Sequence, residues 1–230
     1  MTKLNFLLIL AVLILSSCSS GQKKNTVSIS TASTGVVKNH DLEFPLYLTD
    51  KIELRESVIG KTNADVFIVH TGHLLKANAS KAVNEASLES LKGKGIDVVN
   101  LSIEDFIIAD QQEISFEKYP QKFLNSSVVN LNEDNIIAKS NITPYIIHDG
   151  VALIGLSDKN IDKLLSMDKF LVSDYVLAVL RARKAALKDS SLDGTPSTPL
   201  HSFVIVHTMG PDINEVMERL PPNFINSLAD

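Results

Sequence analysis

The sequence predicts a single-domain α/β fold, a sandwich of helices and strands that contains mixed sheets. Short β-branched runs of strand length alternate along the chain with longer segments of helical periodicity, a pattern typical of parallel strands joined by helices. One Asp-Gly pair, Asp149-Gly150, lies between two apolar runs and is a strong signal for an antiparallel hairpin. Parallel and antiparallel pairing are therefore expected in the same molecule.

In the first half of the chain, apolar or β-branched runs predict strands over 27–31, 65–69 and 96–101. A helix is predicted over 77–92, and the glycines that follow it, Gly93 and Gly95, end the pattern. Its apolar residues at helical spacing are Ala79, Val83, Ala86 and Leu91. A second, more polar helix is predicted over 103–117.

In the second half, short strands are predicted over 128–131 and 136–138, and the hairpin strands over 145–148 and 151–156. Segment 173–188 predicts an amphipathic helix with basic residues toward its end, where cations complement the helix dipole. The residues expected to face inward are Val176, Leu177, Leu180 and Leu187. We expect a loop over 189–199, then a buried strand over 203–206 and a closing helix over 213–220.

The only cysteine, Cys18, follows a segment that is typical of an export signal. Lys3 precedes an apolar run over 4–15, which is too short for a comfortable membrane span. The residues at 15–18, Leu-Ser-Ser-Cys, resemble the lipobox of bacterial lipoproteins, in which the cysteine is acylated and becomes the first residue after cleavage. Lipidation explains a lone thiol in a compartment where disulfides form. The alternatives are an uncleaved anchor and an ordinary signal peptide.

This interpretation divides the chain into a signal peptide over 1–17, the lipidated cysteine with a flexible tether over 18–26, and one domain over 27–230. Cleavage removes Lys3, so the formal net charge changes from −5 to −6. Because basic residues are not clustered, nucleic acid is not an expected partner. The expected partner is a membrane, bound through the lipid on Cys18. Some bacterial lipoproteins are retained at the inner membrane by an aspartate directly after the lipidated cysteine. This chain has Ser19 at that position, which favours the outer membrane.

Several segments, taken in their order along the chain, resemble the motifs of a known family. They are 96–101 (IDVVNL), 140–142 (SNI), 145–156 (YIIHDGVALIGL) and 203–210 (FVIVHTMG). They resemble the motifs DAVNLGNHEFD, SANI, PYVI…GVKVGVIGL and DVVIVLSHLG of the N-terminal domain of periplasmic 5'-nucleotidases, a branch of the calcineurin-like metallophosphoesterases. The resemblance implies a metallophosphoesterase-like fold over about residues 27–225. In that family, two metal ions about 3.5 to 4 Å apart are held by Asp, His and Asn at strand ends.

Most of the metal ligands that the resemblance implies are replaced in this sequence. The family motif Asn-Asp-x-His-Gly falls on 31–35, where Ala32 and Thr34 replace the ligands, and the bridging aspartate falls on His73. The motif Gly-Asn-His-Glu falls on 102–105, which lacks the amide and the imidazole. The strand-end histidine is retained as His207, and no histidine follows it. Because the loss of one ligand weakens a metal site severely, the resemblance implies a degenerate relative without a dinuclear centre.

We therefore predict a lipid-anchored, non-catalytic binding or assembly protein of the cell envelope, which needs no cofactor. The alternative is an active metal-dependent phosphoesterase with a remodelled site. In it, His70, His73 and His207 would bind one zinc or manganese ion and leave a position open for water, with His40 as a fourth ligand or as a hydrogen-bond partner of a ligand. Glu104 or Asp105 would then be the general base.

A third hypothesis is a protein partner in the envelope. Its docking surface would be the acidic surface of the domain or the loop near Gly194.

Overall fold

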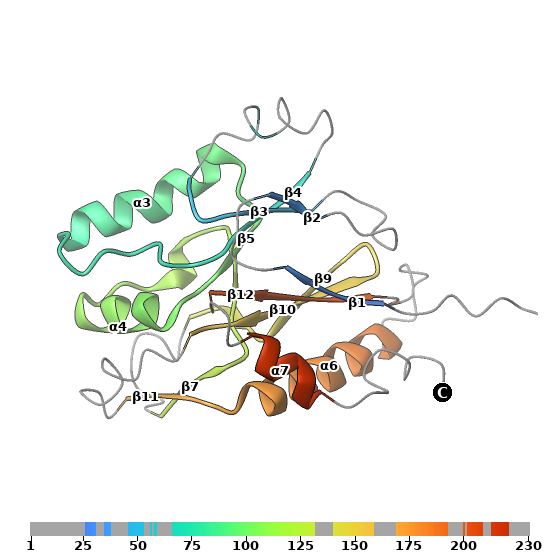
Figure 1. The fold of residues 1–230 in the computed structure, drawn as a ribbon. Helices are drawn as coiled ribbons and strands as arrows, with labels where there is room; N and C mark the ends of the chain where they lie inside the picture. The colour runs from blue at the N-terminus through green and yellow to red at the C-terminus, as the bar shows by residue number, and fades with distance from the viewer. Residues whose placement is uncertain are drawn as a thin grey trace, which may run out of the picture.

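The computed structural model describes residues 26–30, 35–37, 46–52, 56, 58, 66–131, 140–158, 169–192, 200, 202–208 and 213–220, of which 26–30, 35–37 and 191–192 are described by their backbone alone. In this part of the chain, two β-sheets are stacked on each other and helices cover their outer faces (Figure 1). Helices α3 (Lys81–Lys94) and α4 (Ile103–Gln111) lie on one side, and α6 (Tyr175–Leu192) and α7 (Ile213–Arg219) lie on the other.

The larger sheet has the strand order β2-β3-β4-β5-β6-β8. Neighbouring strands pair in parallel from β3 to β8, whereas β2 and β3 are antiparallel. The bounds are β2 Gly35–Val37, β3 Leu46–Thr49, β4 Phe67–His70, β5 Val98–Asn100, β6 Lys122–Leu124 and β8 Ile142–Thr143.

The smaller sheet has the order β1-β12-β10-β9, with bounds β1 Thr26–Ser30, β12 Ser202–His207, β10 Val151–Leu156 and β9 Tyr145–His148. Strands β1, β12 and β10 are parallel, and β9 pairs antiparallel with β10. The turn between β9 and β10 has positive φ angles at Asp149 (44°) and Gly150 (74°), as a type I′ turn requires. A separate two-stranded ribbon joins β7 (Val128–Asn130) to β11 (Phe170–Val172).

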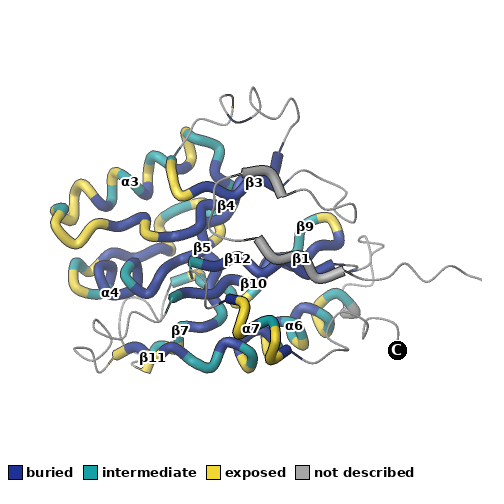
Figure 2. The backbone as a smooth tube through the Cα atoms, viewed as in Figure 1, coloured by how far each residue is buried: buried dark blue, intermediate teal, exposed yellow. Residues whose placement is uncertain are grey.

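Each sheet uses one face for the space between the sheets and the other for its helices, because side chains alternate along a strand. The layer between the sheets is an apolar cluster with residues from both of them, including Val69 and Leu124 of the larger and Leu153 and Val204 of the smaller. The intervening residues, such as Ile68 and Phe203, belong to the cluster that packs under the helices. Figure 2 shows this arrangement as buried strands in the middle and exposed residues on the helices.

The helix ends follow local sequence signals. Ser80 caps α3 by accepting a hydrogen bond from the Val83 N–H, and Gly95 ends the helix in the left-handed conformation (φ 71°). Helix α4 begins with a capping box formed by Ser102 and Asp105. At the start of α6, Asp174 Oδ1 accepts from the Leu177 N–H at 3.1 Å.

The predicted α/β fold class with mixed sheets is confirmed. The hairpin is found with the predicted bounds, and the predicted strands over 27–31, 65–69, 96–101, 128–131 and 203–206 are found within three residues at each end. The helices over 77–92, 173–188 and 213–220 are present with shifted ends. Strands β2, β3, β6, β8 and β11 were not predicted.

The predictions for two helices are wrong in part. Helix α4 ends at Gln111 and not at 117, because Glu113 takes a positive φ of 53° and a 3-10 turn, η1 (Phe116–Lys118), follows. Helix α6 continues through 189–192, where a loop was predicted. Leu177, predicted to face inward, is 43% exposed, whereas Val176, Leu180 and Leu187 pack against the core as predicted. The buried small residues of α6 are Ala178, Ala182 and Ala186.

The apolar face predicted for the helix over 77–92 is also wrong in part. Val83 is 56% exposed and Ala86 is exposed, whereas Leu91 is buried together with Asn84 and Leu88. The strand predicted over 136–138, the signal peptide over 1–17 and Cys18 with its tether lie outside the described residues. Among the residues that are described, no helix has the length and apolar character needed to cross a membrane.

Candidate functional site

The carboxyl ends of the parallel strands of both sheets meet at one edge of the sandwich, where α/β proteins usually bind their ligands. Two close approaches show that the sheets meet there. The Asn100 amide at the end of β5 donates to the Leu156 carbonyl at the end of β10 at 3.0 Å. A Cβ placed on Gly72, after β4, would lie 2.5 Å from Cγ2 of Thr208, after β12. We call this region the strand-end edge.

Two of the candidate metal ligands, His70 and His207, are buried at this edge but on opposite outer faces of the double sheet. His70 pairs in register with Val99, which packs under the helices, and lies on the α3/α4 side. His207 pairs with Leu156, which also belongs to the helix-facing cluster, and lies on the α6/α7 side. Within the described residues, His70 and His207 belong to no group of three or more His, Cys, Asp or Glu side chains that could hold a metal ion.

His70 is further occupied by its own hydrogen bond. Its Nδ1 accepts from the Gly72 N–H at 3.3 Å, which places the ring proton on Nε2. Burial lowers the pKa of His70 to about 4, with a smaller opposing contribution from Asp50, so the ring is neutral at neutral pH. The Nδ1 lone pair is therefore engaged by the backbone.

The exposed candidates, His73 and Glu104, do come together. Nδ1 of His73 lies 3.2 Å from Oε2 of Glu104, and their side chains are 43% and 24% exposed. His73 has a positive φ of 57°, an uncommon conformation for a non-glycine residue. The Ser102 hydroxyl accepts from its N–H at 3.3 Å, and the Lys76 ammonium donates to its carbonyl at 2.9 Å. The imidazole of His73 is therefore held in one place at the surface of the strand-end edge.

The other candidate base, Asp105, is fully buried and part of the framework. Its Oδ1 accepts from the Leu75 N–H at 2.8 Å, and its Oδ2 accepts from the Ser102 N–H at 2.9 Å and hydroxyl at 2.8 Å. Burial raises the pKa of this carboxyl, and its hydrogen bonds oppose the rise. The carboxylate caps α4 and holds the loop after β4, so its oxygens face the backbone and not a substrate.

Between the sheets, the edge is filled by a loop that we call the bridging loop, residues 125–127. Asn125 shapes it: its amide donates to the Leu101 carbonyl at 2.7 Å, and its Oδ1 accepts from the N–H groups of Ser127 (2.9 Å) and Val128 (2.8 Å). Ser126 donates from both its N–H (2.8 Å) and its hydroxyl (2.6 Å) to the Gly155 carbonyl of the smaller sheet.

Ser157, which follows β10, completes this network. Its N–H donates to the Ser127 hydroxyl at 2.8 Å, and its own hydroxyl accepts from the Ile103 N–H of α4 at 2.5 Å. Neutral amide and hydroxyl groups thus join β5, β6, β10 and α4 at this edge. Asn125, Ser127 and Ser157 were not predicted as site residues. Asn125 follows directly on β6 and Ser157 on the predicted strand β10, and this position was the available signal.

The strand ends approach too closely for larger residues. A Cβ on Gly155 would lie 2.4 Å from the Asn100 Oδ1 and 2.7 Å from Cγ of Leu124. A Cβ on Gly72 would also meet the Asn100 carbonyl at 2.9 Å. The interior of the strand-end edge is therefore packed with protein atoms.

Within the described residues, the donor set does not fit a dinuclear metal centre. Two metal ions need several carboxylate, imidazole or amide ligands that converge, whereas the described residues contain no group of three or more His, Cys, Asp or Glu side chains able to hold an ion. The remaining candidate ligand, His40, lies outside the described residues.

No family profile matches the sequence, and no curated protein matches it. Solved structures do share its fold. A 5'-nucleotidase precursor of Thermus thermophilus aligns with a TM-score of 0.52 and 13% identity over 85% of this chain and 39% of that chain. The sulfate thiohydrolase SoxB of Thermus thermophilus aligns with a TM-score of 0.51 and 13% identity over 72% of this chain and 30% of that chain.

The chain therefore spans between about a third and two fifths of the length of these proteins. At this identity the likeness concerns the fold alone, and it confirms the metallophosphoesterase-like α/β sandwich that the sequence predicts.

Proposed function

We propose that this chain is a lipid-anchored protein of the cell envelope whose metallophosphoesterase-like domain has a non-catalytic, binding or assembly role. The observation that carries this proposal is the bridging loop with its partners. At the strand-end edge, where metal ligands would have to converge, the polar atoms of Asn125, Ser127 and Ser157 form hydrogen bonds with each other and with the backbone. A fold can persist in this way after its site chemistry changes, since packing and catalysis depend on different residues.

Metal content and activity of the purified full chain test this proposal. We expect much less than one zinc or manganese per chain by elemental mass spectrometry, and no hydrolysis of an aryl phosphate or of 5'-nucleotides with added Mn²⁺. About one ion per chain, lost in both His73→Ala and His207→Ala, would overturn the non-catalytic role.

The second candidate function is a phosphoesterase with a remodelled site, and the pair of His73 and Glu104 favours it. A carboxylate that holds one ring nitrogen orients the other for a metal ion or a proton transfer. If this function is correct, Mn²⁺-dependent activity should fall by at least about 100-fold in His73→Ala, as for the loss of a general base. The control is His148→Ala, since His148 stacks on Phe67 at 4.1 Å and belongs to another part of the molecule.

The anchor is proposed from the sequence, because Cys18 lies outside the described residues. In cells fed a labelled fatty acid, the native chain should carry the label and Cys18→Ser should not, and the variant should keep its precursor length. Normal processing of Cys18→Ser without lipid would contradict the anchor and leave the ordinary signal peptide. Fractionation of the two membranes tests the favoured outer membrane separately from the anchor.

An envelope protein partner is the remaining part of the proposal. Cross-linking of the native chain in intact cells should then give one specific adduct, and its absence would contradict an assembly role while leaving small-ligand binding in place.

A further inference from the structure

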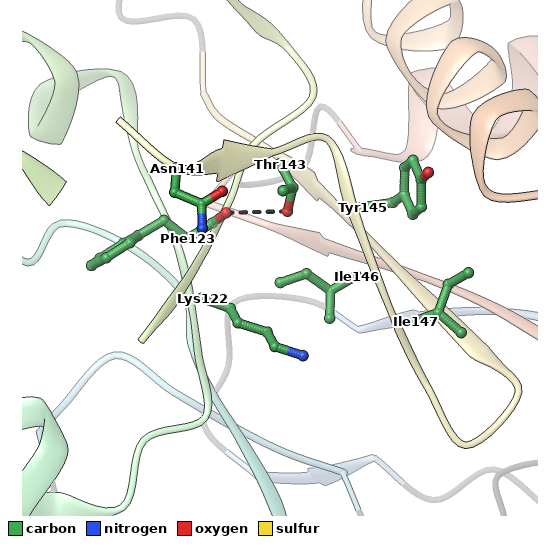
Figure 3. Close-up of a pocket in the computed structure, with 7 residues that line it drawn as sticks. All are labelled: Lys122, Phe123, Asn141, Thr143, Tyr145, Ile146 and Ile147. Atoms are coloured by element: carbon green, nitrogen blue, oxygen red, sulfur yellow. Dashed lines mark hydrogen bonds between the residues drawn. The ribbon is translucent and has the colours of Figure 1, made fainter. Parts of the chain in front are cut away.

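The space between the two sheets opens to the surface where the chain crosses from β8 to β9. A pocket of about 260 Å³ lies at this opening (Figure 3). The residues that line it are Lys122, Phe123, Asn141, Thr143, Tyr145, Ile146 and Ile147. It involves none of the residues of the bridging loop.

The register of the strands places polar groups where the rest of this layer is apolar. Lys122 lies two residues before Leu124 on β6, so it shares the inward face of that strand. Thr143 pairs with Leu124 across the sheet and therefore lies on the same face. Ile146 faces them from the smaller sheet as part of the inter-sheet cluster. Figure 3 shows the Lys122 side chain extending beside Ile146.

A lysine on an inward face departs from the pattern of the neighbouring strands, whose inward residues include Leu46, Leu48, Val69 and Val98. Such a departure from the fold's own pattern is expected mainly at functional positions. The inward position of Lys122 does not bury its charge, because the side chain is exposed at the mouth of the pocket.

The polar groups of the pocket favour an anion. In the part of the chain that the structure describes, Lys122 is the only charged residue of the lining, so no carboxylate there competes for its ammonium. Within the described residues neither the Lys122 ammonium nor the Asn141 amide makes a hydrogen bond or an ion pair. The Thr143 hydroxyl is already committed as a donor, at 3.4 Å, to the Phe123 carbonyl. The ammonium and the amide are thus the side-chain donors left for a ligand, and Ile146 gives the pocket an apolar wall.

We propose that this pocket binds a small organic anion, with its charged group against Lys122 and Asn141 and its apolar part against Ile146. The volume lies just below the range for drug-sized ligands, which suits a short-chain carboxylate or phosphate monoester and not a nucleotide. The inference goes beyond the proposed function and does not depend on it, because the pocket is separate from the strand-end edge and from the anchor.

Saturation-transfer NMR on the purified full chain tests the pocket with sodium hexanoate as the probe. Hexyl phosphate distinguishes a phosphate ligand from a carboxylate, and hexanol and hexylammonium report apolar contact without the negative charge. We expect a hexanoate or hexyl phosphate Kd on the order of 1 mM, typical of so small a ligand. Hexanol and hexylammonium should bind at least about 10-fold more weakly, since a charge-assisted hydrogen bond is lost.

The variant Lys122→Met keeps the aliphatic stem and removes the charge, and it should weaken binding of the anion at least about 10-fold. The matched control is Lys118→Met, another exposed lysine, on η1 and outside the pocket, which should bind as the native chain does. Asn141→Ala provides a second variant if Lys122→Met does not fold, and it should also weaken binding, because it removes the amide donor of the pocket. No saturation transfer to either anion, or equal binding by the native chain and Lys122→Met, would overturn the proposal.

Discussion

Gly72 is the residue whose identity the strand-end edge constrains most. Its φ is 114°, a conformation that only glycine adopts readily, and an added Cβ would meet Thr208 and the Asn100 carbonyl. Gly72→Ala should lower the free energy of unfolding by about 2–4 kcal/mol, from backbone strain and overpacking together. Urea denaturation measures this value.

Gly93→Ala is the matched control, because Gly93 is helical and a Cβ there would meet nothing within 4 Å. It should raise the free energy of unfolding by about 0.5–1 kcal/mol through helix propensity. Equal effects of the two substitutions would show that the strand ends are not tightly packed at Gly72.

His70 makes the stability depend on pH. Burial lowers its folded-state pKa to about 4 from the usual 6.5, so the unfolded chain binds a proton in this interval and the folded chain does not. The contribution of His70 is therefore fully present above pH 6.5 and is lost as the pH falls toward 4, by about 3 kcal/mol in all.

Urea titrations between pH 4 and 8 check this prediction. His70→Gln should flatten the dependence below pH 6.5, and the control interval is pH 7 to 8, where the two proteins should have parallel profiles. A variant that keeps the native slope between pH 4 and 6.5 would show that other groups cause it.

At the level of elements, the start of α4 depends on Ser102. Its hydroxyl donates to Asp105 Oδ2 and accepts from the N–H groups of Asp105 (3.2 Å) and His73 (3.3 Å), so one side chain fixes both the helix and the loop after β4. Ser102→Ala should lower the free energy of unfolding by about 2 kcal/mol.

Ser115→Ala is the matched control for Ser102→Ala. Ser115 precedes η1 and makes no capping hydrogen bond, so the change should be under about 0.5 kcal/mol by thermal or urea unfolding. If both substitutions cost the same, the capping box does not stabilise α4.

The elements that the sequence predicts well are those with a strong local signal. The Asp149-Gly150 turn and the apolar run at 151–156 gave correct bounds, because turn chemistry and complete burial of β10 are both local properties. Strands β6 and β8, of three and two residues, are set by pairing with distant neighbours and carry no period of their own. The face of α6 was misjudged at Leu177 because the buried face is centred on Ala178, Val179 and Ala182, and Leu177 lies outside it.

The candidate site could be predicted only in part, because its contacts also join segments that are distant in the sequence. The sequence indicated that polar residues follow the strands, which placed His70, His73 and His207 at one edge. It could not show that the register turns His70 and His207 to opposite faces, since the two sheets are related by tertiary packing alone. Nor did Asn125 and Ser157 stand out, because their partners are backbone groups far away in the chain.

At the level of the whole molecule, the bridging loop determines how firmly the two sheets are joined at the strand-end edge. It contacts β10 through Ser126 and the residue after β10, Ser157, through Ser127. The loop is itself held by the buried side chain of Asn125. Because the contacts within each sheet are separate from this loop, weakening it should loosen the sandwich as a unit and not unravel a single strand.

Asn125→Ala tests this joint. It removes the side-chain hydrogen bonds to Leu101, Ser127 and Val128 and leaves the Leu101 carbonyl without its donor, so the free energy of unfolding should fall by about 3 kcal/mol. Amide hydrogen exchange should also rise in both β5 and β10, since the two sheets share the loop. The matched control is Asn78→Ala, in the same Asn-x-Ser pattern but exposed, with an expected change under about 0.5 kcal/mol. Faster exchange confined to β5 and β6 would mean that the smaller sheet is held by its apolar layer alone.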